Sequence, residues 1–324
     1  MIQNFQFTLQ VAKLLKIFNK KKSAITSNKS PYFLLILVIL FWGVNWPIMK
    51  MGVQHMPPLW FATTRILLGS LFLFGVLIIQ RRCILPKKSD WKILITITIF
   101  QIALPTALIH SGLKFLGAGR SAVLVFTMPL WVAPLAYFFL KEKLNPLKLV
   151  GLILGLSGIA ILFNPIGYDF TNKSLLFGNF LMLLASLSFA SAIIFLQRNI
   201  NSTPIIQLVP WQLILASIFL AVAALAIEGI PQVNLTPTLF AIMAYNGPIA
   251  SGFCFWAYIY VSSILPAMNT SMGSLGIPII GVLSSTILLG ELLKSFEIIG
   301  LTSIFLGVLL VSYDGIKRLE RTKS

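Results

Sequence analysis

The stretch I-L-I-T-I-T-I-F-Q-I-A-L-P-T-A-L-I-H-S-G-L (93–113) decides the fold class, because it contains no Asp, Glu, Lys or Arg. A hydrocarbon core about 30 Å thick needs roughly 20 predominantly apolar residues in helical form, since lipid offers no partner for an unpaired backbone group. This stretch meets that requirement. Further uncharged runs follow it, and the last of them is long enough for two or more spans: 121–140, 149–168, 174–197 and 229–290.

The composition also indicates a membrane protein. Hydrophobic residues make up 57% of the chain, charged residues only 10%, and the mean hydropathy is +0.92, whereas an ordinary soluble domain has about a quarter charged residues. The continuous apolar runs differ from the alternating strands of a β-barrel. The sequence therefore predicts an all-α integral membrane protein with ten transmembrane helices. We place them near 32–52, 58–80, 93–113, 118–140, 147–164, 175–197, 208–227, 238–262, 268–290 and 296–314.

The net charge of +17 is explained by membrane topology. Lys and Arg lie almost entirely in short loops and tails between the predicted spans, and cytoplasmic loops retain such positive charge. The tail 1–31, the loops after spans two and four, and the tail 315–324 carry most of them. Because the number of spans is even, we expect both termini to be cytoplasmic in a cell inner membrane, and we expect no nucleic-acid partner. The tail 1–31 is either an interfacial helix on anionic lipid or disordered.

The two halves of the chain resemble each other. Sliding the sequence against itself by 149 positions aligns Pro129 with Pro278 and Glu142 with Glu291 without a gap. Each repeat unit then contains five spans, in 32–164 and in 175–314, and an odd number inverts the second copy in the membrane. Inverted repeats are typical of secondary transporters, whose sites lie near the midplane between the halves. Two glycine pairs match at the same offset: Gly151 with Gly300 and Gly158 with Gly307.

Pro129 and Pro278 lie close to the middle of their predicted spans. Proline removes an intrahelical hydrogen bond and clashes with the preceding turn, so a kink is expected at each. A carbonyl freed at membrane depth must be covered by protein or by a wet cavity. Two interpretations stay open, a packing kink and a functional hinge that lines a cavity.

Four segments carry a family resemblance: G-R-S-A-V-L-V-F-T-M-P-L-W-V-A-P-L-A-Y-F-F-L-K-E-K-L (119–144), P-I-I-G-V-L-S-S-T-I-L-L-G-E-L-L (278–293), F-W-G-V-N-W (41–46) and A-T-T-R-I-L-L-G (62–69). Together, over roughly residues 32–315, they resemble the EamA domain of the drug/metabolite transporter superfamily. The resemblance implies a ten-helix carrier of two five-helix repeats around a central cavity, often an exporter of amino acids, other metabolites or drugs.

One position departs from that pattern. The second copy has Gly290 before Glu291, whereas the first has Lys141 before Glu142, which puts a tight turn there in question. The two glutamates end spans on opposite sides of the membrane. We expect a structural role for them, satisfying loop donors or the positive N-terminus of the next helix, with proton coupling as the alternative.

Polar and aromatic side chains within the spans are the candidates for a substrate cavity, since amides that face lipid would be unsatisfied. Arg65 lies about seven residues inside the second span, or roughly 10 Å of helix. It either snorkels to the interface or attracts a substrate carboxylate in the cavity. Trp46, Trp60 and Tyr260 are assigned to interfacial belts. The candidate cavity residues, each with helix packing as its alternative, are Trp42, Asn45, Arg65, Gln101, His110, Trp131, Asn179, Asn246, Trp256 and Tyr258.

The sequence thus predicts a secondary transporter, an exporter of small metabolites such as amino acids or drugs by alternating access, with a small-molecule substrate and the lipid bilayer as partners. The alternative is an integral membrane enzyme acting on lipid or a lipid-linked substrate, which would need converging carboxylates, histidines or basic clusters. No catalytic residue is predicted. Cys83 and Cys254 show no metal-ligand spacing, so no metal or other cofactor is predicted. Without a phosphate-binding loop, a proton gradient or facilitated movement remains as the driver.

Overall fold

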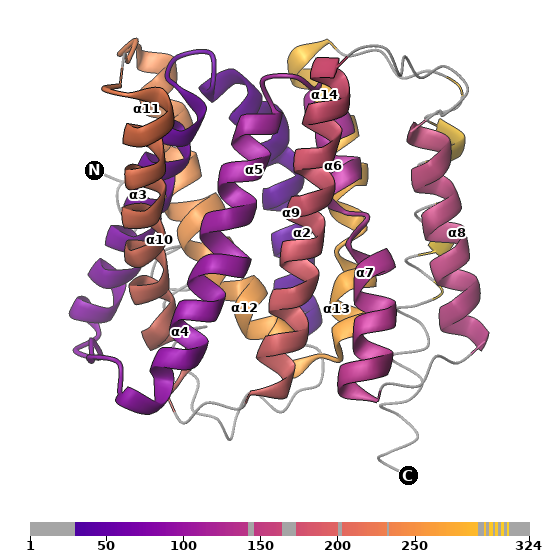
Figure 1. The fold of residues 1–324 in the computed structure, drawn as a ribbon, viewed down its shortest axis with the longest axis horizontal. Coiled ribbons are helices and arrows are strands. Elements are labelled where there is room, and N and C mark those ends of the chain that lie inside the picture. The colour runs from indigo at the N-terminus through magenta and orange to yellow at the C-terminus, as the bar shows by residue number, and fades with distance from the viewer. Residues whose placement is uncertain are drawn as a thin grey trace, which may run out of the picture.

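The computed structural model describes residues 30–141, 146–163, 173–199, 203–231, 233–290, 295, 298–300, 302, 303, 306, 307 and 310. Throughout these residues the regular structure is helical. Seven helices among them are long and apolar enough to cross a membrane. Figure 1 shows the helices standing side by side, with α11 and α8 at opposite edges of the bundle.

The first half of the chain forms five helical passes. The first two are unbroken helices, whereas the third and fourth consist of consecutive segments. The third starts at Lys88, slightly before the predicted span. The elements are α2 (Ser30–Gly52), α3 (Pro58–Ile79), η1 (Lys88–Asp90), α4 (Trp91–Ile97), η2 (Thr98–Ala103), α5 (Leu104–Gly112), α6 (Ala118–Val125), α7 (Met128–Leu135), η3 (Ala136–Leu140) and α8 (Pro146–Phe163).

The second half repeats this order of elements. Adding 149 to the bounds of α6 gives 267–274, against Ala267–Gly273 for α13. The π-helical segment η2 shifts to 247–252, against Asn246–Phe253 for η5. The elements are α9 (Lys173–Arg198), α10 (Ile205–Glu228), α11 (Pro237–Tyr245), η5 (Asn246–Phe253), α12 (Cys254–Ile264), α13 (Ala267–Gly273) and α14 (Gly276–Leu289). The predicted tenth span, 296–314, lies largely outside the described residues, so the count of ten stays a prediction.

Helix contacts between the halves come in exchanged pairs. α2 packs against α14, and the equivalent helices α9 and α7 also pack together. In the same way α5 contacts α9 while α12 contacts α2, and η2 contacts α10 while η5 contacts α3. The core therefore lies between the two halves.

The fourth and ninth predicted spans are interrupted rather than only kinked. Phe126 and Thr127 separate α6 from α7, and Ser274 and Leu275 separate α13 from α14. Each predicted hinge proline falls in the first turn of the helix after the interruption, where a proline removes no existing hydrogen bond. Hydroxyl groups cover carbonyls beside each break: Thr127 Oγ1 donates to Leu124 O at 2.7 Å and Ser274 Oγ donates to Ser271 O at 2.7 Å.

The turn questioned at Lys141 is formed in both halves. Lys141 has φ 55° and Gly290 has φ 69°, so both adopt the left-handed conformation that ends a helix. The left-handed conformation strains the backbone of a lysine, which carries a Cβ atom, but not that of a glycine. Glu142 and Glu291, which follow these two residues, lie outside the described residues, and their structural role stays a prediction.

Polar side chains tie the ends of the helices together. The Glu228 carboxylate accepts hydrogen bonds from the backbone amides of Leu59 and Trp60, both at the start of α3. Lys50 Nζ donates to the carbonyl oxygens of Leu113 and Leu116, just past the end of α5. A carboxylate at a helix N-terminus and an ammonium at a C-terminus both neutralise unpaired backbone groups.

Candidate functional site

A cavity lies between the two halves, and the space open to a water-sized molecule is about 50 Å³. This holds a few water molecules. Helices α2, α3, α5, α6, α7, α9 and α12 contribute to its wall, together with the interruption between α6 and α7. Its lining residues are Trp42, Asn45, Trp46, Met49, Arg65, Thr106, Ile109, His110, Val125, Phe126, Met128, Phe189, Phe255 and Tyr258.

Helical periodicity explains much of this lining. Trp42, Asn45, Trp46 and Met49 are spaced by three or four residues and therefore share one face of α2. Thr106, Ile109 and His110 follow the same spacing on α5, and Phe255 and Tyr258 on α12. At the repeat offset, Thr106 and Ile109 correspond to Phe255 and Tyr258, so equivalent positions of both halves line the cavity.

Of the predicted cavity residues, the structure brings together Trp42, Asn45, Arg65, His110 and Tyr258. The other five lie outside this lining. Gln101 and Asn246 are buried in the π-helical segments, and Asn246 Nδ2 donates within its own helix to Ile242 O at 3.1 Å. Trp256 packs against other aromatic rings, stacking on Tyr260 with centroids 6.0 Å apart. Trp131 lies on α7, and Asn179 is buried on α9.

Trp46, assigned to an interfacial belt from the sequence, instead lines the cavity and packs edge-on against Phe126 with centroids 6.5 Å apart. The prediction gave weight to its closeness to the end of the span. Its position one residue after Asn45, on the same helical face as Trp42, was the signal for the cavity. The same spacing of three to four residues places Met49 on this cavity-lining face of α2.

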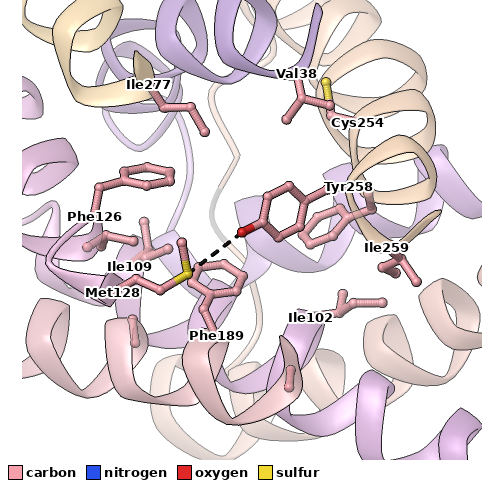
Figure 2. Packing of buried hydrophobic residues seen from close by; sticks show 14 of the residues in the cluster. Val38, Ile102, Ile109, Phe126, Met128, Phe189, Cys254, Tyr258, Ile259 and Ile277 are labelled. Carbon is pink, nitrogen blue, oxygen red and sulfur yellow. Dashed lines mark hydrogen bonds between the residues drawn. The ribbon is translucent and has the colours of Figure 1, made fainter. Parts of the chain in front are cut away.

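The aromatic wall is held by specific contacts. Trp42 Nε1 donates to the carbonyl oxygen of Ala250 at 2.7 Å, and the Trp42 ring lies 5.1 Å from Tyr258 and 5.3 Å from Phe255, centroid to centroid. The Tyr258 hydroxyl points at the sulfur of Met128, 3.7 Å away, beside Phe126 and Phe189 (Figure 2). These contacts fix an apolar, aromatic surface of the kind that holds the body of a small organic molecule.

Arg65 is the cation of this cavity. It is only 4% exposed, so it lies in the protein interior and not at the interface. Its Nε donates to Ser251 Oγ at 2.9 Å, and its Nη1 lies 2.7 Å from Met49 Sδ and 3.4 Å from His110 Nε2. All of these partners are uncharged side chains. Among the described residues, no carboxylate pairs with Arg65, so its charge is available to an anionic ligand.

Asn45 contributes an acceptor. Its side chain is 2% exposed, and its Oδ1 atom has no hydrogen-bond partner among the residues that the structure describes. A buried carbonyl oxygen without a donor is costly unless a ligand or water supplies one. The described residues hold no group of three or more His, Cys, Asp or Glu side chains that could bind a metal ion, and both cysteines are free.

Comparison with known proteins assigns the family. The model of the EamA-like transporter family matches residues 29–164 and 176–313. The chain belongs to the EamA-like transporter family. Both matched segments include lining residues of the cavity, so the site is built from the family's two copies.

Proteins of similar sequence are named as transporters. The chain is 29% identical over 286 residues to the uncharacterized transporter YoaV of Bacillus subtilis, covering 88% of this chain and 97% of that protein. It is 26% identical to a probable amino-acid metabolite efflux pump of Salmonella typhimurium, over 85% of this chain and 92% of that protein. A solved crystal structure with 15% identity matches with a TM-score of 0.72, over 89% of this chain and 98% of that one, which shows a shared fold.

Proposed function

We propose that this EamA-family protein is a secondary carrier that exports small carboxylate-bearing metabolites, with amino acids as the first class to test. The observation that carries the proposal is Arg65, a buried cation in a cavity whose contacts with it are all uncharged. A carboxylate fits the planar donor geometry of a guanidinium group and neutralises its buried charge.

The remaining lining favours a ligand with an apolar body and an N–H donor. The rings of Trp42, Phe255 and Tyr258 offer an apolar surface. Asn45 Oδ1 has no donor partner and can accept a hydrogen bond from an ammonium group. An α-amino acid with an apolar side chain supplies all three features. The relative named as an amino-acid metabolite efflux pump supports the same class.

Alternating access between two inverted five-helix repeats is the proposed mechanism. The matching element order at an offset of 149 and the exchanged helix contacts support a pseudo-twofold relation between the halves. Rocking of one repeat against the other then opens the cavity to either side in turn. The interruptions before Pro129 and Pro278 are the proposed hinges, because a break in a helix absorbs a change in backbone angles that a continuous helix resists. We propose that both termini are cytoplasmic and that the membrane is the cell inner membrane.

Counterflow in proteoliposomes tests the carrier. Vesicles containing the purified protein are loaded with a pool of unlabelled amino acids, and the entry of each labelled amino acid is measured. We expect saturable counterflow that is lost in Arg65→Ala and reduced in Arg65→Lys, because lysine keeps the charge but loses the two-point geometry. Arg120→Ala is the matched control, since Arg120 lies within a predicted span but does not line the cavity.

Two outcomes would contradict the proposal. Absence of counterflow for every amino acid in the pool, with correctly folded protein, would overturn the substrate class. Undiminished counterflow in Arg65→Ala would overturn the role of Arg65. Competition with leucine analogues sharpens the result: leucinamide lacks the carboxylate and should not compete, whereas 4-methylpentanoate lacks the amine and should compete more weakly than leucine.

A further inference from the structure

His110 is buried beside Arg65, and its two ring nitrogens have different partners. The side chain is 1% exposed. Nδ1 lies 2.7 Å from the carbonyl oxygen of Thr106, which can only accept, so we assign the ring hydrogen to Nδ1. In the neutral ring Nε2 then carries a lone pair. That nitrogen faces Arg65 Nη1 at 3.4 Å and accepts from it.

This arrangement opposes a second proton on His110 while the cavity is empty of anions. A proton on Nε2 would place an imidazolium directly against a guanidinium, with the centroid of the Phe61 ring 5.5 Å from that of the imidazole. Two like charges at that separation repel strongly in an apolar environment. A carboxylate bound to Arg65 removes this conflict, because it can accept a hydrogen bond from both cations at once.

Among the described residues, no acidic side chain is free to place a negative charge beside His110, so that charge is left to a ligand. On α3 the facing charge is Arg65, and Tyr258 of α12 lines the same cavity. The two described acids are used elsewhere: Asp90 accepts from Thr203 Oγ1, and Glu228 accepts from amides of α3. Elements α3, α6, α9 and η2 pack against α5, and their other charged side chains are Arg120 on α6 and Lys173 and Arg198 at the ends of α9. Further titratable side chains lie on α2 (Tyr32, Lys50), α11 (Tyr245) and α12 (Cys254, Tyr260).

We propose that a carboxylate anion on Arg65 and a proton on His110 Nε2 bind this cavity cooperatively, so that efflux of the substrate down its own concentration gradient carries a proton with it. This inference rests on the proposed function. The proton comes from water on the open side and forms the Nε2–H bond, which donates to the carboxylate. On the opposite side the Nε2–H bond breaks, the proton returns to water and the carboxylate leaves, so that Nε2 regains its lone pair. A zwitterionic amino acid carried with one proton transfers one positive charge, whereas a monocarboxylate carried with one proton transfers none.

Linkage fixes the sign of the effect. If the anion favours the proton, the proton must favour the anion by the same factor. Coupling factors between bound groups are typically about 5 to 150-fold. We therefore expect the dissociation constant for a carboxylate to fall by about tenfold between about pH 8 and about pH 6, because the bound anion returns the proton affinity of His110 towards that of an ordinary histidine while the carboxylate itself stays ionised over this range.

The experiment measures binding of 4-methylpentanoate, a carboxylate with no amine of its own to titrate, to the purified full-length protein in detergent. Quenching of tryptophan fluorescence reports binding, because Trp42 and Trp46 line the cavity. The chain contains only two histidines. His110→Asn keeps a donor for Thr106 O but cannot take a proton near neutral pH, and His55→Asn, outside the cavity lining, is the matched control.

Wild type and His55→Asn should bind about tenfold more tightly at the lower pH, and proton uptake should accompany binding in a weakly buffered solution. His110→Asn should bind with the same constant at both pH values and take up no proton. A pH dependence that survives in His110→Asn, or binding by the wild type without pH dependence, overturns the inference. If Arg65-dependent counterflow persists in that case, the carrier proposal stands alone; if counterflow and binding are both absent, the carrier proposal fails as well.

Discussion

The indole N–H of Trp42 and the carbonyl oxygen of Ala250 lie 2.7 Å apart and join the two halves of the protein at the wall of the cavity. Trp42 comes from α2, and Ala250 lies within the π-helical segment η5. A π-helical turn displaces backbone carbonyls from the regular pattern of an α-helix, and such segments are frequent at functional sites. The Trp42 ring thus lines the cavity, and its hydrogen bond ties α2 to the irregular backbone segment η5.

Replacing Trp42 by Phe should therefore destabilise the protein. The variant leaves Ala250 O without this donor, which costs about 1 to 3 kcal/mol for a buried group. Thermal unfolding in detergent measures the loss. Trp131→Phe is the control, because Trp131 Nε1 is buried and finds no hydrogen-bond partner in the described part of the chain. It should leave the melting temperature unchanged or raise it. Equal losses in the two variants would contradict the importance of the Trp42 bond.

Gly69 should be intolerant of substitution because α3 meets η5 there. A Cβ atom on Gly69 would lie 2.7 Å from Ser251 Cβ and 2.8 Å from the backbone nitrogen of Gly252. A backbone clash cannot be relieved by a side-chain rotation, so Gly69→Ala should cost about 1 to 3 kcal/mol. On the same helix, a Cβ on Gly75 would meet nothing within 4 Å. Gly75→Ala should be neutral or stabilising by up to about 1 kcal/mol, as thermal unfolding of both variants would show.

The helical class was predictable because an uncharged run such as 93–113 has only one stable form in a bilayer. The helix interruptions at Phe126 and Ser274 were not predictable in position, because the prolines that marked them lie two to four residues further along the chain. A polar residue in a span shows that its side chain needs a hydrogen-bond partner, but the sequence does not show on which side of the helix that partner lies. Asn45 faces the cavity while Asn246 bonds within its own helix, and this difference depends on the rotation of each helix against its neighbours.

Glu228 should contribute to stability from the opposite half of the chain. Its carboxylate accepts from Leu59 N and Trp60 N at 3.1 and 3.2 Å, at the positive end of α3. Glu228→Ala removes both acceptors and should cost about 1 to 3 kcal/mol. Glu228→Gln keeps one weaker acceptor and should cost less, because an ionised acceptor is stronger than a neutral one. Melting temperatures in the order wild type, Gln, Ala are expected, and the reverse order of the two variants would refute the cap.

Ser251 should position Arg65 for its ligand. Ser251 Oγ accepts from Arg65 Nε at 2.9 Å, so Ser251→Ala removes a hydrogen bond to a charged group and loosens the guanidinium. We expect KM for counterflow to rise about fivefold, which corresponds to about 1 kcal/mol, with a smaller change in maximal rate. Ser285→Ala is the control, because Ser285 is fully buried on α14 and its Oγ has no hydrogen-bond partner within the described ranges. A KM that stays at the wild-type value in Ser251→Ala would show that Arg65 is held without it.

Cys83 tests the proposed orientation without any engineering of new cysteines. It is exposed in the loop between α3 and η1, on the side that carries the basic loops, whereas Cys254 is fully buried. If these basic loops are cytoplasmic, a membrane-impermeant maleimide should label inside-out vesicles and leave sealed right-side-out vesicles unlabelled. Cys83→Ser should abolish labelling in both, because a buried thiol is inaccessible to the reagent. Labelling confined to right-side-out vesicles would reverse the topology, and the cavity cation Arg65 would then lie nearer the cytoplasmic side.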